Sequence, residues 1–131
     1  MNRLLEEHTT RGIIASFREV HRTLGFGYRE LIYLRALERE LVARGHRVDR
    51  QVAVMVYYKG ETLARQIIDL IVDEKVVVEA KATERLHPAA APQLFSYLCS
   101  TKLEVGLLLH FGREPKFKRL ICENRLKRRP A

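Results

Sequence analysis

The hydrophobic residues of this chain change their spacing near residue 46, and this change constrains the fold more than any other feature. Before it they recur every three or four residues, which is the period of an amphipathic helix. A first helix is predicted over about residues 5–24 and ends at Gly25, with Ile13, Ile14, Phe17, Val20 and Leu24 facing inward. A second is predicted over about residues 28–44 and ends at Gly45, with Leu31, Leu34, Leu37 and Leu41 facing inward.

Beyond residue 46 the period becomes two, which is typical of β-strands. The first predicted strand carries the alternating residues Val48, Val52, Val54 and Val56. A turn at residues 57–61 leads to a second strand over residues 63–72, and a tight turn at residues 73–75 leads to a third over residues 76–82. The three consecutive valines at positions 76–78 indicate that both faces of this third strand are buried.

The last third of the chain is predicted to add one helix and one or two strands. Pro88 and Pro92 frame the start of a helix that runs to about Thr101, and residues 105–111 form an apolar strand that Gly112 closes. Residues 117–122 are predicted as a short edge strand. The order ααβββαβ(β) describes an α/β fold, a mixed sheet flanked by helices. Without repeats or a low-complexity linker, residues 1–131 are expected to form a single domain.

Composition excludes several classes of protein. Hydrophobic residues make up 47% of the 131 residues and charged residues 31%, a mixture found in globular proteins rather than disordered ones. No apolar run approaches the roughly 20 residues that span a bilayer, and the N-terminus lacks the apolar core of a secretory signal. We therefore expect a cytoplasmic protein with no membrane contact. Cys99 and Cys122 lack metal-ligand spacing, so two reduced, partly buried thiols are expected.

Positive charge is concentrated at the C-terminus. The net charge is +8, and residues 113–131 contribute eight basic and two acidic residues, which is six of those eight charges. A basic tail over about residues 123–131, containing Lys127, Arg128 and Arg129, suits a polyanion such as nucleic acid. A solvated tail with no partner explains the same charge equally well.

An acidic pair and a lysine meet on the predicted hairpin of the second and third strands. If the turn is centred on Glu74, Asp69 faces Glu79, and Lys81 leaves the same face as Glu79. Burying these charges costs several kcal/mol per ion unless they pair or bind a metal. Oxygen ligands suit Mg²⁺ or Mn²⁺, and Lys81 would hold or activate a water beside the ion. A structural salt-bridge cluster of the same three residues is the alternative.

Asp69 followed ten residues later by Glu79-Ala80-Lys81, on a hairpin after a helix, resembles the PD-(D/E)XK nuclease superfamily, whose core is restriction-endonuclease-like. Residues 27–33 (Gly-Tyr-Arg-Glu-Leu-Ile-Tyr) match the signature of its GxxExxY branch. Residues 19–22, 56–60 and 107–112 also agree with that branch, so the resemblance covers about residues 5–122. Two positions depart from the pattern: Ile68 stands where proline is common, and His110 stands where asparagine is expected.

The resemblance implies further site residues. Glu30, on the helix before the sheet, would join the metal shell directly or through water, and Tyr33 lies one turn away on the same helical face. The Ala80 carbonyl would be a further metal ligand. Gln93 and Tyr97 resemble a QxxxY element whose amide and phenol contact substrate phosphate. Two alternatives stay open, namely a surface Glu30 paired with Arg29 or Arg35 and a chance QxxxY spacing.

These features together predict a Mg²⁺- or Mn²⁺-dependent nuclease that hydrolyses phosphodiester bonds of nucleic acid, with DNA as the first choice. Gln93, Tyr97, Tyr33 and the basic tail would bind the substrate backbone. The alternatives are a non-catalytic nucleic-acid-binding module of the same fold and a regulatory interaction protein. The small footprint of the chain is compatible with a homodimer, although no motif demonstrates one.

Overall fold

The computed structural model describes residues 5–128 and contains the elements in the predicted order. They are α1 (Glu7–Leu24), α2 (Glu30–Ala43), β1 (Val48–Tyr58), β2 (Glu61–Val72), β3 (Val76–Lys81), α3 (Ala90–Cys99), β4 (Val105–Phe111), β5 (Pro115–Ile121) and the short 3₁₀ helix η1 (Asn124–Leu126). The predicted edge strand is present as β5, and it begins two residues earlier than expected. No helix among the described residues is long and apolar enough to cross a bilayer.

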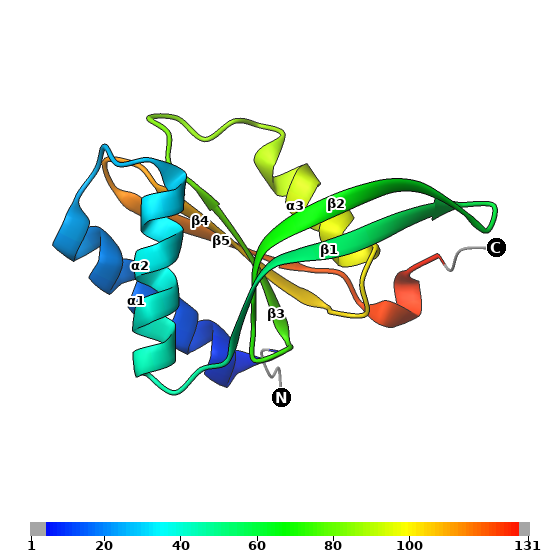
Figure 1. The fold of residues 1–131 in the computed structure, drawn as a ribbon, viewed down its shortest axis with the longest axis horizontal. Coiled ribbons are helices and arrows are strands. Elements are labelled where there is room, and N and C mark those ends of the chain that lie inside the picture. Colours follow the sequence, from blue (N-terminus) through cyan, green and yellow to red (C-terminus); the bar gives the residue numbers. More distant parts are fainter. Residues whose placement is uncertain (1–4, 129–131) are drawn as a thin grey trace.

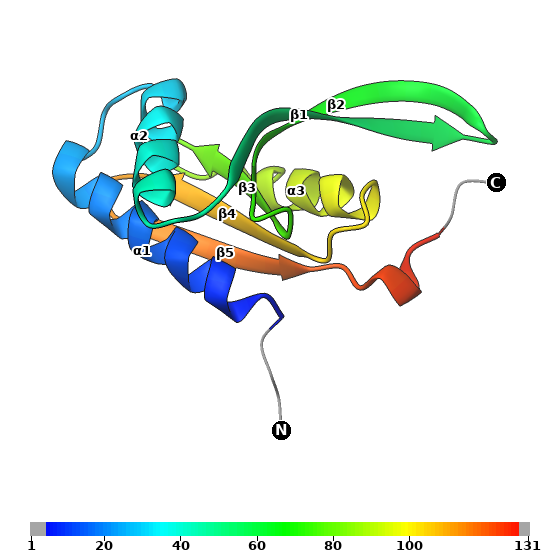
Figure 2. The same cartoon turned by 60° about the horizontal axis from the view of Figure 1, so that its bottom comes forward.

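The five strands form one mixed sheet in the order β1-β2-β3-β4-β5. Only β3 and β4 run parallel, with α3 as the connection between them, and the other neighbours pair antiparallel. Helices α1 and α2 cover one face of the sheet, and α3 covers the other (Figure 1, Figure 2). The predicted class, a mixed sheet flanked by helices, is confirmed.

The face under α1 and α2 is organised around aromatic side chains. Phe111, at the end of β4, stacks on Tyr33 with ring centroids 4.3 Å apart, and Phe17 meets its edge at 4.8 Å. One inward position on α2 was predicted wrongly, since Leu31 is 44% exposed and Tyr33 is fully buried. Tyr33 shares its helical stripe with Leu37 and Leu41 at a spacing of four, so the stripe that meets the sheet is rotated from the one predicted.

The face under α3 is packed more closely. Gly106 on β4 lies directly beneath this helix, and a Cβ added there would meet the methyl groups of Leu94 and Leu98 at 3.1 and 3.2 Å. Val77 on β3 belongs to the same cluster, whereas Val76 and Val78 point to the opposite core. All three valines are fully buried, so the predicted burial of this strand on both faces is confirmed.

β1 and β2 leave the sheet as a twisted ribbon that extends past α3 (Figure 1, Figure 2). At its tip, Lys59 and Gly60 have φ angles of 49° and 81°, the pair of positive values that a two-residue hairpin turn requires. The ribbon can diverge because β2 pairs with β3 over only three residues, Leu70 to Val72. This divergence creates the gap in which the candidate site lies.

The two cysteines are neighbours, which their spacing in the sequence did not suggest. Cys99 ends α3 and is exposed, whereas Cys122 follows β5 and is buried, so the expected partial burial of both is wrong. The two Sγ atoms lie 3.3 Å apart as free thiols. Although Cys99 as a residue is exposed, partial desolvation of its thiol, followed by the contact with Cys122, raises the pKa of that thiol to about 11.

Candidate active site

The acidic pair lies where β2 separates from β3. The antiparallel ladder between these strands runs from Val72–Val76 to Leu70–Val78 and then stops. The next pair in the same register is Asp69 and Glu79, so the predicted register is confirmed up to this point. Beyond it β2 turns away with β1 and leaves a fork between the two strands (Figure 1).

Each carboxylate closes part of the fork by accepting a main-chain hydrogen bond from the opposite strand. The Asp69 N–H donates to Glu79 Oε1 at 3.0 Å, and the Ala80 N–H donates to Asp69 Oδ2 at 3.0 Å. In an antiparallel ladder the N–H and C=O of one residue point to the same edge of the strand. The Ala80 carbonyl is therefore also directed at the fork, which gathers two carboxylates and one carbonyl.

The ladder between β1 and β2 is interrupted at the same level. Arg50 pairs with Leu70 and Val52 pairs with Ile68, whereas the intervening Gln51 has a φ of 51°. A positive φ is uncommon for a residue with a Cβ and turns the local main chain away from regular pairing. Asp69 is therefore not part of the regular ladder with either neighbouring strand. Nothing in the sequence at Gln51 indicates this conformation.

Glu79 carries the strongest electrostatic perturbation of the fork. Its side chain is 4% exposed, and no ion pair within residues 5–128 involves Glu30, Asp69 or Glu79. Burial and the Asp69 carboxylate raise the pKa of Glu79 to about 8. The alternative of a structural salt-bridge cluster therefore does not hold, because the two carboxylates face each other without a paired cation.

Lys81 and the predicted QxxxY pair approach the fork from the α3 side. The Lys81 Nζ donates to Gln93 Oε1 at 3.4 Å, which links the end of β3 to α3. Tyr97, one turn further along α3, is 7% exposed. Burial and the charges of Glu79 and Asp69 raise the pKa of its phenol. The predicted shared face of Gln93 and Tyr97 thus lies beside the acidic pair, and Tyr97 keeps its proton as a donor.

Glu30 is the first residue of α2 and approaches from the other side. Burial and the negative charge of Asp69 raise its pKa, and the positive charge of Lys81 opposes this shift. Glu30 makes no ion pair with Arg29 or Arg35 among the described residues, so that alternative is not seen. Glu30 also does not join the acidic pair directly, because in the described part of the chain no three His, Cys, Asp or Glu side chains gather closely enough to hold one metal ion.

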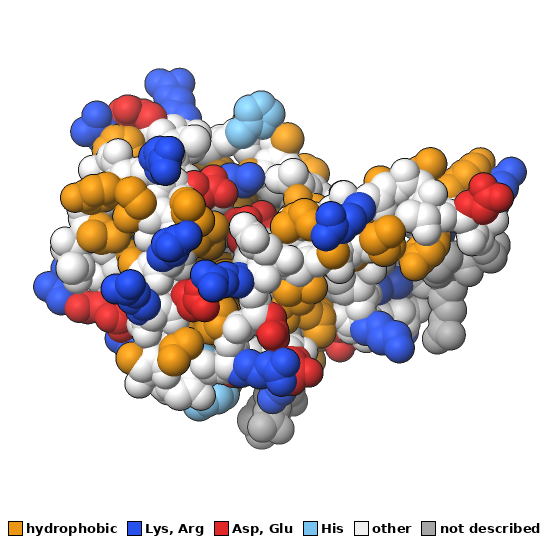
Figure 3. Space-filling view, viewed as in Figure 1, with side chains coloured by type: hydrophobic (Ala, Val, Ile, Leu, Met, Phe, Trp, Pro, Cys, Tyr) orange, Lys and Arg blue, Asp and Glu red, His pale blue; other side chains and the backbone are white. Residues whose placement is uncertain are grey.

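Two clefts border the fork. One, of about 350 Å³, lies between α2 and the start of the ribbon and includes Asp69, Gln51 and Arg50 in its wall. The other, of about 240 Å³, lies beside α3 and includes Lys81 and Gln93. The space-filling view shows acidic and basic atoms at the floor of the hollow between α2 and the base of the ribbon (Figure 3). Asp69 is thus reached from the cleft beside α2, and Lys81 and Gln93 from the cleft beside α3.

Comparison with known proteins agrees with this geometry. A family model described as the PD-(D/E)XK nuclease superfamily matches residues 7–120. The chain belongs to the PD-(D/E)XK nuclease superfamily. The crystal structure of SSO0001 superimposes with a TM-score of 0.54 at 16% sequence identity, which covers 90% of this chain and 59% of that one. This likeness concerns the fold, and the chain spans about three-fifths of the length of SSO0001. A search of curated proteins found no match.

Members of this superfamily are typically nucleases that use divalent metal ions, and the fork fits such an ion by its donor chemistry. Mg²⁺ commonly takes one or two carboxylates and keeps several waters. Asp69, Glu79 and the Ala80 carbonyl supply three oxygen donors, and the two carboxylates repel each other unless a cation neutralises them. The negative charge of Asp69 helps to raise the pKa of Glu30, so the two carboxylates interact electrostatically.

Two of the predicted substrate-binding groups lie elsewhere. The Tyr33 hydroxyl donates to the Gly25 carbonyl within the core, and the fully buried side chain has no exposed surface for a substrate contact. Lys127 donates to the carbonyls of Thr101 and Leu103 at 2.8 and 2.6 Å, beside the start of β4.

That position lies at the other end of the sheet from the fork. Val105 at the start of β4 pairs with Val76, whereas His110 near its end pairs with Lys81, so about 17 Å of strand separates these two positions. Arg128 follows Lys127 and is exposed, and Arg129 lies outside the described residues. The structure therefore does not bring the described part of the basic tail to the acidic pair.

His110 supports the site from the neighbouring strand. It pairs with Lys81 in the parallel ladder and is 7% exposed. Its Nε2 lies 2.7 Å from the Thr83 carbonyl, two residues beyond Lys81, and this contact holds the chain as it leaves β3. A buried histidine with a main-chain partner is the structural role that its place on an apolar strand favours.

Proposed function

We propose that this protein is a Mg²⁺- or Mn²⁺-dependent nuclease that hydrolyses phosphodiester bonds, with DNA as its first substrate. The observation that carries the proposal is the pair of main-chain hydrogen bonds that fixes Asp69 and Glu79 in the fork without a cationic partner. A purely structural site would not need one buried and one half-buried carboxylate that repel each other. At the fork itself, a phosphate group would also be repelled by them unless a divalent cation were bound.

Asp69, Glu79 and the Ala80 carbonyl would hold the ion, and Glu30 would contact it through water. The ion, when bound, supplies charge neutralisation at the phosphate and lowers the pKa of bound water. Lys81, whose amine donates to Gln93 at 3.4 Å, would orient the attacking water and offset the negative charge that develops on the phosphate. Gln93 and Tyr97 donate hydrogen bonds to the phosphate as neutral groups that do not compete for the ion.

Residues 27–33 support a finer placement within the superfamily. Their sequence, Gly-Tyr-Arg-Glu-Leu-Ile-Tyr, resembles the signature of the GxxExxY branch. In the structure Gly27 has a φ of 118°, and Glu30 begins α2 shortly after it. Tyr33 fixes this segment from the core, since its hydroxyl contacts both the Gly25 carbonyl and the Tyr28 N–H. These residues suit a local structural unit that places Glu30 beside Asp69.

A homodimer stays a prediction.

The test is a cleavage assay with single-stranded, double-stranded and branched DNA and with RNA, each in Mg²⁺, Mn²⁺ or EDTA. The wild type is compared with Asp69→Asn and Lys81→Met, which keep the size of the side chains. Asp49→Asn and Lys75→Met are matched controls, because both residues lie near β2 but outside the fork. We expect cleavage that EDTA abolishes, that both site variants lose and that both controls retain.

Three results would contradict the proposal. Cleavage that survives Asp69→Asn would place the activity at another site or in a contaminant. Binding of nucleic acid without cleavage under any metal condition would identify a binding module of the same fold. Absence of both binding and cleavage would favour a regulatory interaction protein.

A further inference from the structure

Three arginines that line the clefts beside the fork lie on α2 and β1 rather than in the C-terminal tail. Arg35 and Arg39 occupy one stripe of α2 at a spacing of four, about 6 Å apart along the helix axis. Arg50 lies on β1, and it lines the same cleft as both of them. This stripe is not the one that packs on the sheet, where Tyr33, Leu37 and Leu41 are buried. Three guanidinium groups therefore border the open side of α2.

These arginines line a continuous groove that begins at the fork. The cleft of about 350 Å³ that contains Asp69 shares Arg35, Glu38 and Arg50 with a neighbouring cleft of about 430 Å³. The second cleft continues along α2 to Arg39 and Val42. From Leu31 to Val42 the groove follows about 17 Å of helix. An extended ligand whose reacting group lies at Asp69 can therefore continue along α2 without leaving the groove.

The charge of the groove suits a polyanion. Arg35 and Arg39 make no ion pair among the described residues, and Arg50 reaches only Glu38, at 3.6 Å. Glu38 is the single acidic residue along this wall beyond Asp69. Exposed pairs at such distances are weak, so Arg50 is available to another partner. Guanidinium groups bind phosphate oxygens in a bidentate geometry, which favours a phosphodiester backbone as the ligand.

We infer that the groove formed by Arg35, Arg39 and Arg50 binds the nucleic-acid backbone that continues from the cleaved phosphate. The path depends on the proposed function, because it takes the fork as the place where the substrate reacts. The tail at η1 lies at the other end of the sheet and does not share this path. Contacts of this kind are made to phosphates, so they supply affinity without sequence preference.

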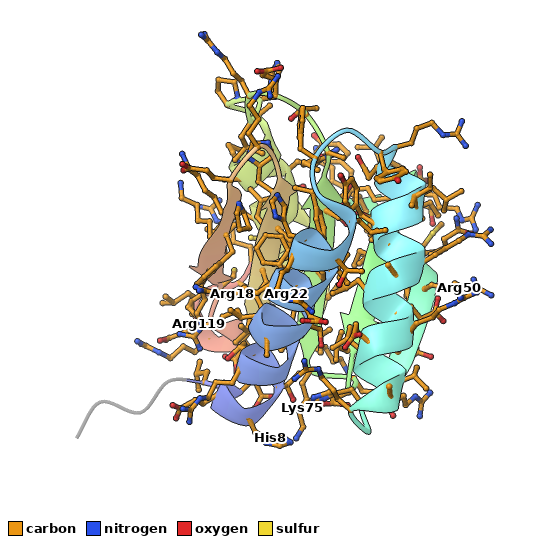
Figure 4. The ribbon with its side chains drawn as sticks, turned by 90° about the vertical axis from the view of Figure 1, so that its left-hand side faces the viewer. His8, Arg18, Arg22, Arg50, Lys75 and Arg119 are labelled. Carbon is orange, nitrogen blue, oxygen red and sulfur yellow. The ribbon has the colours of Figure 1, made fainter. Side chains whose placement is uncertain are left out.

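The test measures the salt dependence of binding for a groove variant and a matched control. The groove variant is Arg35→Ala/Arg39→Ala. The control is Arg18→Ala/Arg22→Ala. It removes two exposed arginines that lie on α1 at the same spacing of four residues. Figure 4 shows Arg18 and Arg22 over α1, whereas Arg50 projects beyond α2. The probes are a labelled 20-nucleotide single strand and its duplex, and binding is followed by fluorescence anisotropy in EDTA, where no metal-dependent cleavage occurs.

The groove variant is expected to lower the slope of log affinity against log salt by about 1.4 for the single strand, or about 1.8 for the duplex, since two phosphate contacts are lost. The control should leave the slope within about 0.4 of the wild type, because it lowers the net charge by the same amount without removing a phosphate contact in the groove. Thermal unfolding of both variants confirms that they are folded.

Equal slopes for the groove variant and the wild type would overturn the inference, and so would equal losses in the groove variant and the control. A wild type that binds neither probe at low salt would also overturn it. Since binding is measured without metal, these outcomes are separate from the cleavage assay. Cleavage can be present while the groove variant binds normally, which would refute the path and leave the nuclease intact.

Discussion

Replacing Glu79 with glutamine should stabilise the metal-free protein, although Glu79 is buried and hydrogen-bonded. In the Glu79→Gln variant the side-chain carbonyl can still accept the Asp69 N–H, and the new amide can donate to the Asp69 carboxylate. The raised pKa of Glu79, about 8 rather than 4.5, means that the folded protein disfavours the charged carboxylate. At pH 7 this difference in pKa lowers the free energy of unfolding by about 3 kcal/mol, and a neutral amide avoids this loss.

The pH dependence gives the sign of this effect. An acid whose pKa is raised on folding costs nothing below its unfolded pKa, because it is protonated in both states. The destabilisation grows as pH rises through 4.5 and is complete above about 8. The stabilisation by Glu79→Gln should therefore be absent near pH 4 and large at pH 7–8. For a chain of this length it corresponds to a rise in unfolding midpoint of roughly 10 °C.

The assay is thermal unfolding followed by circular dichroism in EDTA at pH 4, 7 and 8, and then in Mn²⁺. Glu114→Gln is the control, since Glu114 is an exposed carboxylate outside the fork. Mn²⁺ should raise the midpoint of the wild type, because it binds the folded state, and should change that of Glu79→Gln much less. A Glu79→Gln variant that is less stable than the wild type in EDTA at pH 7–8 would refute the reasoning.

Three further predictions concern stability and are measured by urea unfolding. Gly12→Ala should destabilise by about 1–2 kcal/mol despite its better helix propensity, because the new Cβ would collide with the His46 ring at Nε2. Tyr33→Phe should lose about 1–2 kcal/mol with the buried hydrogen bond to Gly25. Burial alone would raise the pKa of Asp73, but hydrogen bonds led by His46 hold it below its usual value. The stabilisation by ionised Asp73 is lost as pH falls below about 4. Asp73→Asn should therefore make the free energy of unfolding depend less on pH in the acid range. An unchanged pH dependence in the Asp73→Asn variant would contradict this.

The fold and the acidic pair could be predicted because both follow from local patterns. The change from a helical to a strand period defines the order of elements, and the turn after Val72 sets the register that places Asp69 next to Glu79. The spacing of Gln93 and Tyr97 placed both on one face of α3 in the same way. In each case the residues that matter lie within a few positions of one turn or helix, so short-range geometry determines them.

The remaining features depend on packing between distant segments. Leu31 and Tyr33 fit a helical stripe equally well, and the ring of Phe111 decides that Tyr33 is buried. Charge counting predicted the tail as a binding element, but the carbonyls of Thr101 and Leu103 hold Lys127 away from the fork. The separation of β2 from β3 has no sequence signal that we can identify. It is this separation that turns two neighbouring carboxylates into a site.

The most direct test of the central claim, that the fork between β2 and β3 binds a divalent cation, is a titration of Mn²⁺ followed by electron paramagnetic resonance. The signal of free Mn²⁺ falls when the ion is bound, so the method counts sites without requiring a substrate. We predict saturable binding by the wild type that Asp69→Asn and Glu79→Gln each abolish or weaken at least tenfold, and that Asp49→Asn leaves unchanged. Mn²⁺ binding that is equal in all four proteins, or absent from the wild type, would contradict the claim.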